Sequence, residues 1–108
     1  MLSASRVQEL VQAELSRFED SALKTRVLKG LIEPYSQLRL WDYGPPGQEF
    51  PCWIVYDTPE CSVGIAYCEV GFGPRAPWGL LSLEGGPRGM GPDSSWFARL
   101  EQAAAEVL

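Results

Sequence analysis

The residues best suited to chemistry are three cysteines, Cys52, Cys61 and Cys68, because the 108-residue chain contains no histidine. The lack of histidine excludes Ser-His-Asp and Cys-His catalytic arrangements and removes the commonest metal ligand. An odd cysteine count without a C-x-x-C pair matches neither a disulfide framework nor a four-ligand zinc site. If Cys52 lies opposite Glu69 in a neighbouring strand, the carboxylate disfavours its thiolate. We therefore expect reduced structural thiols, no metal and no cofactor, with a reactive nucleophile as the minority alternative.

Two glycine-rich stretches resemble phosphate-binding loops in part. Residues 71–76 satisfy G-x-G-x-x-A, but Pro77 and a predicted strand follow where the motif needs a helix N-terminus, which indicates a chance match. Residues 85–91 lie between a predicted strand and a predicted helix, so their N–H groups could cradle an anion. They lack the G-K-[ST] ending, and Arg88 is the only cation nearby in sequence. A flexible connector is the favoured interpretation of this stretch.

The net charge of −5 is distributed unevenly along the chain. Its seven arginines and two lysines are scattered, which argues against nucleic acid as a partner. Residues 40–74 contain no lysine or arginine, so their formal charge also equals −5. The five carboxylates of this stretch are those of Asp42, Glu49, Asp57, Glu60 and Glu69.

Length and hydropathy predict one cytoplasmic domain over residues 1–108. Glu9 and Glu14 interrupt the N-terminal region, so it lacks the apolar segment of a secretory signal peptide. No run approaches the roughly 18 apolar residues that a membrane helix needs. We therefore expect no membrane role.

Hydrophobic periodicity predicts helices at both ends. Residues 3–18 carry an apolar stripe at helical spacing, with Ser5 or Ser3 as the N-cap. A second, weaker helix is expected from Asp20 or Ser21; Pro34 forces it to stop by Glu33, and Gly30 either lies near its C-terminus or ends it early. A last helix, capped by Asp93 or Ser94, places Phe97, Leu100, Ala104 and Val107 on one face and Trp96 beside them against the sheet.

The centre of the chain reads as strands separated by turns. Eighteen of the 20 glycines and prolines lie between Gly44 and Pro92. Apolar segments at residues 38–43, 52–57, 63–69 and 78–83 predict four strands, and their short connections indicate an antiparallel meander. The expected fold class is α+β: one or two N-terminal helices, a four-stranded antiparallel meander and a C-terminal helix.

The predicted strands are apolar on both faces, which leaves two outcomes open. Either both faces are buried, which we expect to require the N- and C-terminal helices on opposite sides, or an aromatic patch with a carboxylate rim stays exposed. Tyrosine and tryptophan are enriched where proteins meet, and an acidic rim speeds encounter with a basic partner. The chain thus has the general character of small acidic immunity proteins, which neutralise basic toxins, although no motif assigns it to such a family.

The leading functional hypothesis is a non-catalytic protein-binding module with a basic partner. The expected contact surface includes the loop at residues 44–51 and comprises Trp41, Asp42, Tyr43, Glu49, Trp53 and Asp57. One alternative is a small-molecule or minor enzymatic site, in a pocket walled by Trp41, Trp53, Trp78 and Tyr67. The other is a structural homodimer that pairs through the second apolar face of the sheet.

Overall fold

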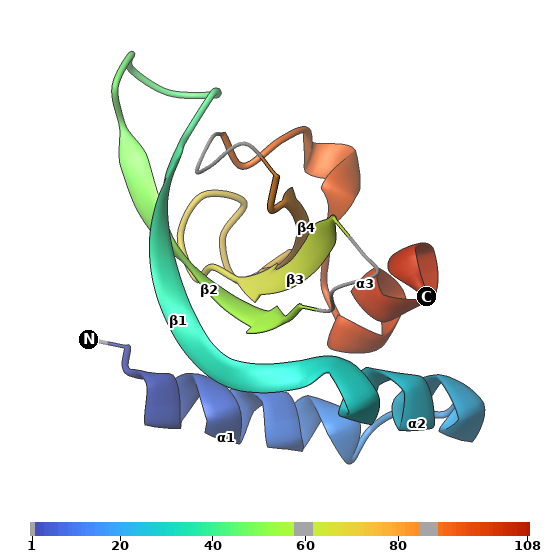
Figure 1. Cartoon of the computed structure of the whole chain (residues 1–108). Helices are drawn as coiled ribbons and strands as arrows, with labels where there is room; N and C mark the ends of the chain where they lie inside the picture. The colour runs from blue at the N-terminus through green and yellow to red at the C-terminus, as the bar shows by residue number, and fades with distance from the viewer. Residues whose placement is uncertain (1, 58–61, 85–88) are drawn as a thin grey trace.

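The computed structural model describes residues 2–57, 62–84 and 89–108. Two helices open the chain, an antiparallel sheet follows, and a third helix closes it (Figure 1). The elements are α1 (Ala4–Leu15), α2 (Ser21–Gly30), β1 (Leu31–Leu40), β2 (Glu49–Tyr56), β3 (Val63–Tyr67), β4 (Trp78–Ser82), the 3-10 helix η1 (Asp93–Ser95), β5 (Trp96–Phe97) and α3 (Leu100–Val107).

The N-terminal helices begin where their capping side chains predict. The Ser3 hydroxyl accepts a hydrogen bond from the backbone N–H of Arg6 at 3.2 Å. The Asp20 carboxylate accepts one from the N–H of Leu23 at 3.0 Å. Each side chain satisfies one of the helix N–H groups that have no intrahelical acceptor. Of the two caps considered for each helix, Ser3 and Asp20 are the ones used.

Of the two ends considered for the second helix, the early one at Gly30 is used, and the expectation that the first strand starts at Leu38 is wrong. Helix α2 ends at Gly30, and β1 begins at the next residue. Pro34 lies inside β1, where the register shifts between Leu31 and Tyr35. Because β1 is an edge strand, the missing N–H of proline removes no essential sheet hydrogen bond. Proline thus marks a bulge in a strand here, where the sequence suggested a helix stop.

The sheet has five strands in the order β1-β2-β3-β4-β5, each antiparallel to its neighbours, where four were expected. The fifth strand comes from a segment predicted to be helical. Trp96 pairs with Gly79 and Phe97 with Trp78, and helix α3 starts only at Leu100. Trp96 and Phe97 point to opposite faces of the sheet, and this alternation over two residues is too short to distinguish from a helical stripe.

All three helices cover one face of the sheet. Val7 and Val11 of α1, Val27 of α2 and Leu100 of α3 join one buried cluster with Val55, which projects from β2. Figure 1 shows α1 and α2 one after the other beneath the strands, with α3 at the α2 end. The expectation that helices must take opposite sides to bury both faces is therefore wrong.

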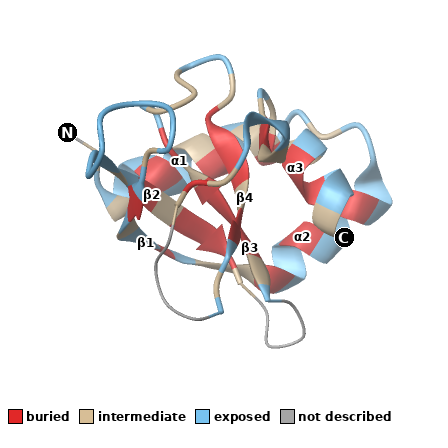
Figure 2. Ribbon diagram, turned by 90° about the horizontal axis from the view of Figure 1, so that it is seen from above, coloured by how far each residue is buried: buried red, intermediate tan, exposed pale blue. Residues whose placement is uncertain are grey.

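Loops cover the second face. Its buried cluster contains Cys52, Ile54, Ala66 and Cys68 of the central strands, together with Met90 from the segment before η1. Figure 2 shows buried residues running along the central strands and on the inward sides of the helices. The second apolar face is thus filled by the chain itself.

Strand β1 bends away from the helices and carries the β1–β2 hairpin beyond them (Figure 1). At its end, Leu40 forms a parallel bridge with Gly89, and the Met90 N–H donates a 3.0 Å hydrogen bond to the Leu40 carbonyl oxygen. Register shifts in β1 and β2 are the kind of irregularity that increases strand bending. The bend places the hairpin's helix-side face beyond the cover of α1.

Candidate functional site

An apolar groove lies where the hairpin extends past the N-terminal end of α1. It has a volume of about 410 Å³ and is lined by Leu2, Phe50, Pro51, Trp53, Glu69 and Val70. Trp53 is half-buried, and it also packs against the helix-side core. Strand β2 therefore holds one wall rigidly from the core, and the segment after β3 supplies the opposite wall.

Two leucines of β1 extend this groove into an exposed apolar surface. Leu38 is 56% exposed and Leu40 is 44% exposed. Leu38 pairs directly with Pro51, and Leu40 pairs with Glu49. Directly paired residues in antiparallel strands project from the same face, so both leucines lie beside the groove. We call these leucines and the groove residues together the hairpin surface.

Carboxylates border the hairpin surface. Glu49 lies opposite Leu40, and Glu69 is part of the groove wall. Arg39, which lies between the two leucines in sequence, is buried on the other face of the strand and does not offset this charge. The Arg6 guanidinium, in the first turn of α1, forms a 3.1 Å ion pair with Glu9. The surface is therefore apolar at its centre and acidic at its border.

The pKa of a tyrosine next to the groove is shifted by its surroundings. The pKa of Tyr67 is raised by burial and, to a lesser extent, by the Glu69 carboxylate. Its ring lies 4.8 Å from that of Trp78, centroid to centroid, in an edge-on contact. This packing anchors the end of β3, from which the Glu69–Val70 wall of the groove continues.

Of the residues predicted to bind a partner, the structure places Trp53 and Glu49 on the hairpin surface. Trp41 and Tyr43 instead leave the strand and turn to the loop-covered side. The Trp41 ring centroid lies 5.2 Å from that of Tyr43 and 4.7 Å from that of Phe72. These two aromatic residues cover the second core.

The two predicted aspartates are separated from the hairpin surface. A Cβ atom added at Gly89 would contact the Asp42 carboxylate, which places Asp42 beside the segment that follows β4. Asp57 lies beyond the other end of β2, where its N–H donates to the Gly30 carbonyl oxygen at 3.2 Å. Along an extended strand of about 3.3 Å per residue, Asp57 is about 26 Å from Glu49. The predicted set therefore does not form one continuous surface.

The predicted contact surface omitted the exposed side chains Leu38, Leu40 and Val70, the partly buried Leu2, and the Glu69 carboxylate. A signal for the leucines was present in the alternation Gln37-Leu38-Arg39-Leu40-Trp41. If Trp41 is assigned to the buried face of the strand, the alternation places both leucines on the opposite face. What the sequence does not reveal is that α1 stops short of them.

The four residues expected to wall an aromatic pocket do not surround one cavity. Trp53, Tyr67 and Trp78 belong to the helix-side core. Trp41 packs against the other core, across the sheet. The four aromatic rings therefore pack in two separate hydrophobic cores.

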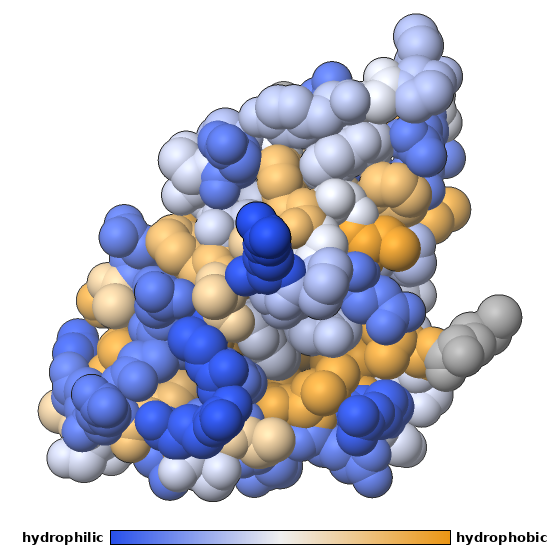
Figure 3. All heavy atoms as spheres, turned by 180° about the vertical axis from the view of Figure 1, so that it is seen from behind, coloured by the Kyte–Doolittle hydropathy of each residue, from blue (hydrophilic) through white to orange (hydrophobic). Residues whose placement is uncertain are grey.

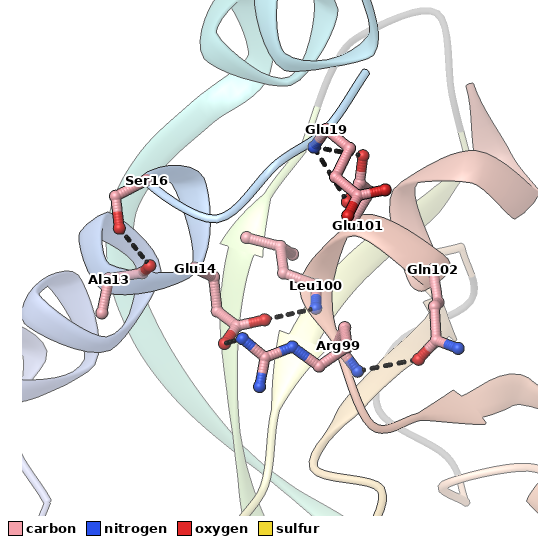
Figure 4. A network of polar contacts seen from close by, with 8 residues as sticks. All are labelled: Ala13, Glu14, Ser16, Glu19, Arg99, Leu100, Glu101 and Gln102. Carbon is pink, nitrogen blue, oxygen red and sulfur yellow. Dashed lines mark hydrogen bonds and ion pairs between the residues drawn. The ribbon is translucent and has the colours of Figure 1, made fainter. Parts of the chain in front are cut away.

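A cavity of about 570 Å³ lies between the end of α1 and the start of α3, and several polar side chains of its wall are engaged in capping. The Glu14 carboxylate accepts a hydrogen bond from the Leu100 N–H at 2.9 Å and pairs with the Arg99 guanidinium at 2.8 Å (Figure 4). Glu101 in turn accepts hydrogen bonds from the N–H groups of Glu19 and Asp20, at 3.0 and 2.9 Å. These contacts join three helix ends and indicate a structural role.

The two described cysteines form a buried pair. Cys52 precedes Trp53 in β2, Cys68 directly follows Tyr67, the last residue of β3, and both cysteines are fully buried. The pKa of Cys52 is raised by its hydrogen bond with Cys68 and by burial. A protonated, inaccessible thiol is a poor nucleophile. Cys61 lies outside the described residues.

Within the described ranges, no three His, Cys, Asp or Glu side chains come together as metal ligands. No helix of the described chain combines the length and apolar character needed to span a membrane.

Seen from behind, the molecule shows hydrophobic atoms next to the N-terminal end of the chain, with hydrophilic side chains around them (Figure 3). The fold is thus an α+β arrangement of three helices on a five-stranded antiparallel sheet. No known family model, curated protein or solved structure matches the chain.

Proposed function

We propose that this protein is a non-catalytic binding module that docks a protein partner on the hairpin surface. The partner presents apolar side chains to the groove and basic groups to Glu49 and Glu69. The observation that carries the proposal is the exposure of Leu38 and Leu40 directly beside an apolar groove. Contiguous exposed apolar surface with a polar border is typical of protein interaction sites.

The shape of the hairpin surface supports a protein partner over a small molecule. The groove continues into the exposed leucines of β1, so its apolar area extends along the hairpin. Small-molecule sites enclose most of the ligand surface in a concave pocket. An elongated apolar strip beside an edge strand is better suited to a peptide segment or a protein face.

The charge distribution supports a basic partner. The cations of the chain are absent from residues 40–74, and Arg39 is buried. Carboxylates at the border of an interface accelerate association with a basic protein and disfavour acidic competitors. The acidic border therefore supplies selectivity, and the apolar groove supplies most of the affinity.

An affinity capture with matched variants tests the proposal. The wild type is compared with Leu38→Ser/Leu40→Ser and with the control Leu28→Ser, which alters a leucine of similar exposure, 51%, on α2. We expect one partner to be retained by the wild type and the control and reduced at least about tenfold on the double variant, since losing two apolar contacts costs more than about 1.4 kcal/mol. Capture at the same level by all three proteins would refute the hairpin surface as the docking site.

The salt dependence of the captured yield provides a second, independent test. The yield on the wild type should fall as ionic strength rises from about 0.15 to 0.5 M, because salt screens exposed charges. Glu49→Gln/Glu69→Gln should weaken this salt dependence. A salt-independent complex would contradict the acidic border as a source of attraction.

A further inference from the structure

Arg39 is a buried cation without an acidic partner. The residue is 1% exposed, and it pairs with Phe50, which packs against the loop-covered core. The Nε–H group donates to Gln37 Oε1 at 2.8 Å, and Nη2 donates to the Ser82 carbonyl oxygen at 2.9 Å. Among the described residues, ion pairs join Arg6 to Glu9 and Arg99 to Glu14, and none involves Arg39. Burial lowers the pKa of Arg39 because desolvation disfavours the cation.

The guanidinium has hydrogen-bonding capacity left over. An arginine carries five N–H donors, and two of those of Arg39 have acceptors in the described structure. No side-chain nitrogen or oxygen of the described residues is both fully buried and without a partner. Nη1 has no acceptor among the described residues, and Arg39 lines an accessible space.

That space is a cavity of about 360 Å³ between the end of β4 and the segment that leads into η1. Arg39, Ser82, Gly89, Gly91 and Ser95 are among its lining residues, and its described wall contains no carboxylate side chain. The positive charge therefore faces an opening whose described wall holds neutral groups.

We propose that this cavity binds a phosphate group, held by the free edge of the Arg39 guanidinium. The planar guanidinium matches two oxygens of a phosphate, and a charge-assisted pair supplies the counter-charge that the protein lacks. The Ser95 hydroxyl on the cavity wall offers a further donor. Four oxygens accept more of these donors than the two of a carboxylate, which favours phosphate. The phosphate is either free in solution or part of a small phosphorylated molecule.

Asp42 offers a control variant for which phosphate binding should become tighter. It lies against Gly89, whose atoms line the cavity, but it is not itself part of the lining. A negative charge next to an anion site weakens binding. The variant Asp42→Asn should therefore bind phosphate more tightly than the wild type, by about two- to fivefold for an exposed charge near the site.

The test is a titration with inorganic phosphate, followed by calorimetry and by the thermal midpoint, at constant ionic strength set with chloride. We expect saturable binding that raises the midpoint. Arg39→Lys keeps the positive charge but lacks the paired N–H donors of the planar guanidinium. This variant should bind phosphate about tenfold more weakly. Ser95→Leu leaves Arg39 in place and fills the opening, so it should abolish binding, and it keeps the test decisive if Arg39→Lys does not fold.

The choice of anion separates the remaining outcomes. Phosphoethanolamine binding as tightly as inorganic phosphate would indicate a phosphate group on a larger molecule, and inorganic phosphate alone would indicate the free ion. Acetate binding as tightly as both would overturn the assignment to phosphate. Absence of saturable binding, or equal binding by wild type and Ser95→Leu, would overturn the site.

Discussion

The carboxylate of Glu14, in the last turn of α1, accepts a 2.9 Å hydrogen bond from the backbone N–H of Leu100, the first residue of α3. The two residues are 86 positions apart in sequence. Glu14 thus acts as a cap for a helix at the other end of the chain, and its charge complements the positive end of the α3 dipole. One side chain therefore ties the two ends of the chain into the same layer.

Removing this cap should destabilise the fold. We expect Glu14→Ala to lower the free energy of unfolding by about 1–2 kcal/mol, the usual cost of a lost cap, as measured by urea denaturation. Arg99 contributes little of this, since its side chain is 41% exposed and surface ion pairs are weak. The matched control Glu9→Gln breaks an exposed pair with Arg6 and should change stability by less than about 0.5 kcal/mol. Equal losses for both variants would show that Glu14 is not a cap.

Gly79 is required by the close approach of Trp96. A Cβ atom at this position would overlap the Trp96 indole, whose Nε1–H donates to the Met90 carbonyl oxygen at 2.8 Å. Gly79→Ala should therefore cost about 1–3 kcal/mol of stability through overpacking. Urea denaturation measures this, and a red shift of tryptophan emission would report the displaced indole. Ser82→Ala, at the exposed last position of the same strand, is the control and should change little. A Gly79→Ala protein as stable as this control would contradict the packing of β5 on β4.

The buried thiol of Cys52 predicts a loss of stability in alkali. Its pKa is raised in the folded protein, whereas an unfolded thiol titrates near about 8.5. Above that pH the unfolded state loses a proton that the folded state keeps, so the free energy of unfolding falls by up to about 1.4 kcal/mol per pH unit. Urea unfolding between pH 7 and 10 measures this slope. Cys68 is buried beside Cys52 and its pKa is lowered mainly by their hydrogen bond, so Cys52→Ala/Cys68→Ala, which removes both thiols, should show a shallower decline. The same slope in both proteins would mean that another group is responsible.

The charges at the border of the hairpin surface should act mainly on association. For the captured partner, Glu49→Gln/Glu69→Gln should lower the association rate constant several-fold at low salt and leave the dissociation rate nearly unchanged. Surface-plasmon measurements at two ionic strengths separate the two constants. Glu9→Gln/Glu106→Gln removes the same number of charges from exposed positions on α1 and α3 and serves as the control. A change confined to dissociation would place the carboxylates inside the contact instead of at its border.

Local sequence patterns predicted the elements whose cause is local. Strands β2, β3 and β4 appeared where apolar segments lie between turns, and the α1 stripe and the Asp20 cap predicted two helices. The errors concern residues whose state depends on distant partners. Pro34 is compatible with a strand because β1 is at the sheet edge, and Trp96 belongs to a strand because Gly79 leaves room for its ring.

The candidate site was predictable only in part for the same reason. Aromatic content and missing cations drew attention to residues 40–74, and Trp53 and Glu49 do lie on the hairpin surface. Trp41 was assigned to that surface because the alternation separates it from Leu38 and Leu40 but does not say which of the two faces the rest of the chain covers. Whether Leu38 is exposed depends on where α1 ends relative to the bent hairpin, which is a property of the tertiary structure.

The most direct test of the docking surface is site-specific photocrosslinking. A benzophenone amino acid is placed at position 38 in the hairpin surface and, separately, at position 28 on α2, two leucine positions of similar exposure. After irradiation with the captured partner, we predict a covalent complex from position 38 and none from position 28. A complex from position 28 alone, or equal yields from both positions, would contradict docking on the hairpin surface.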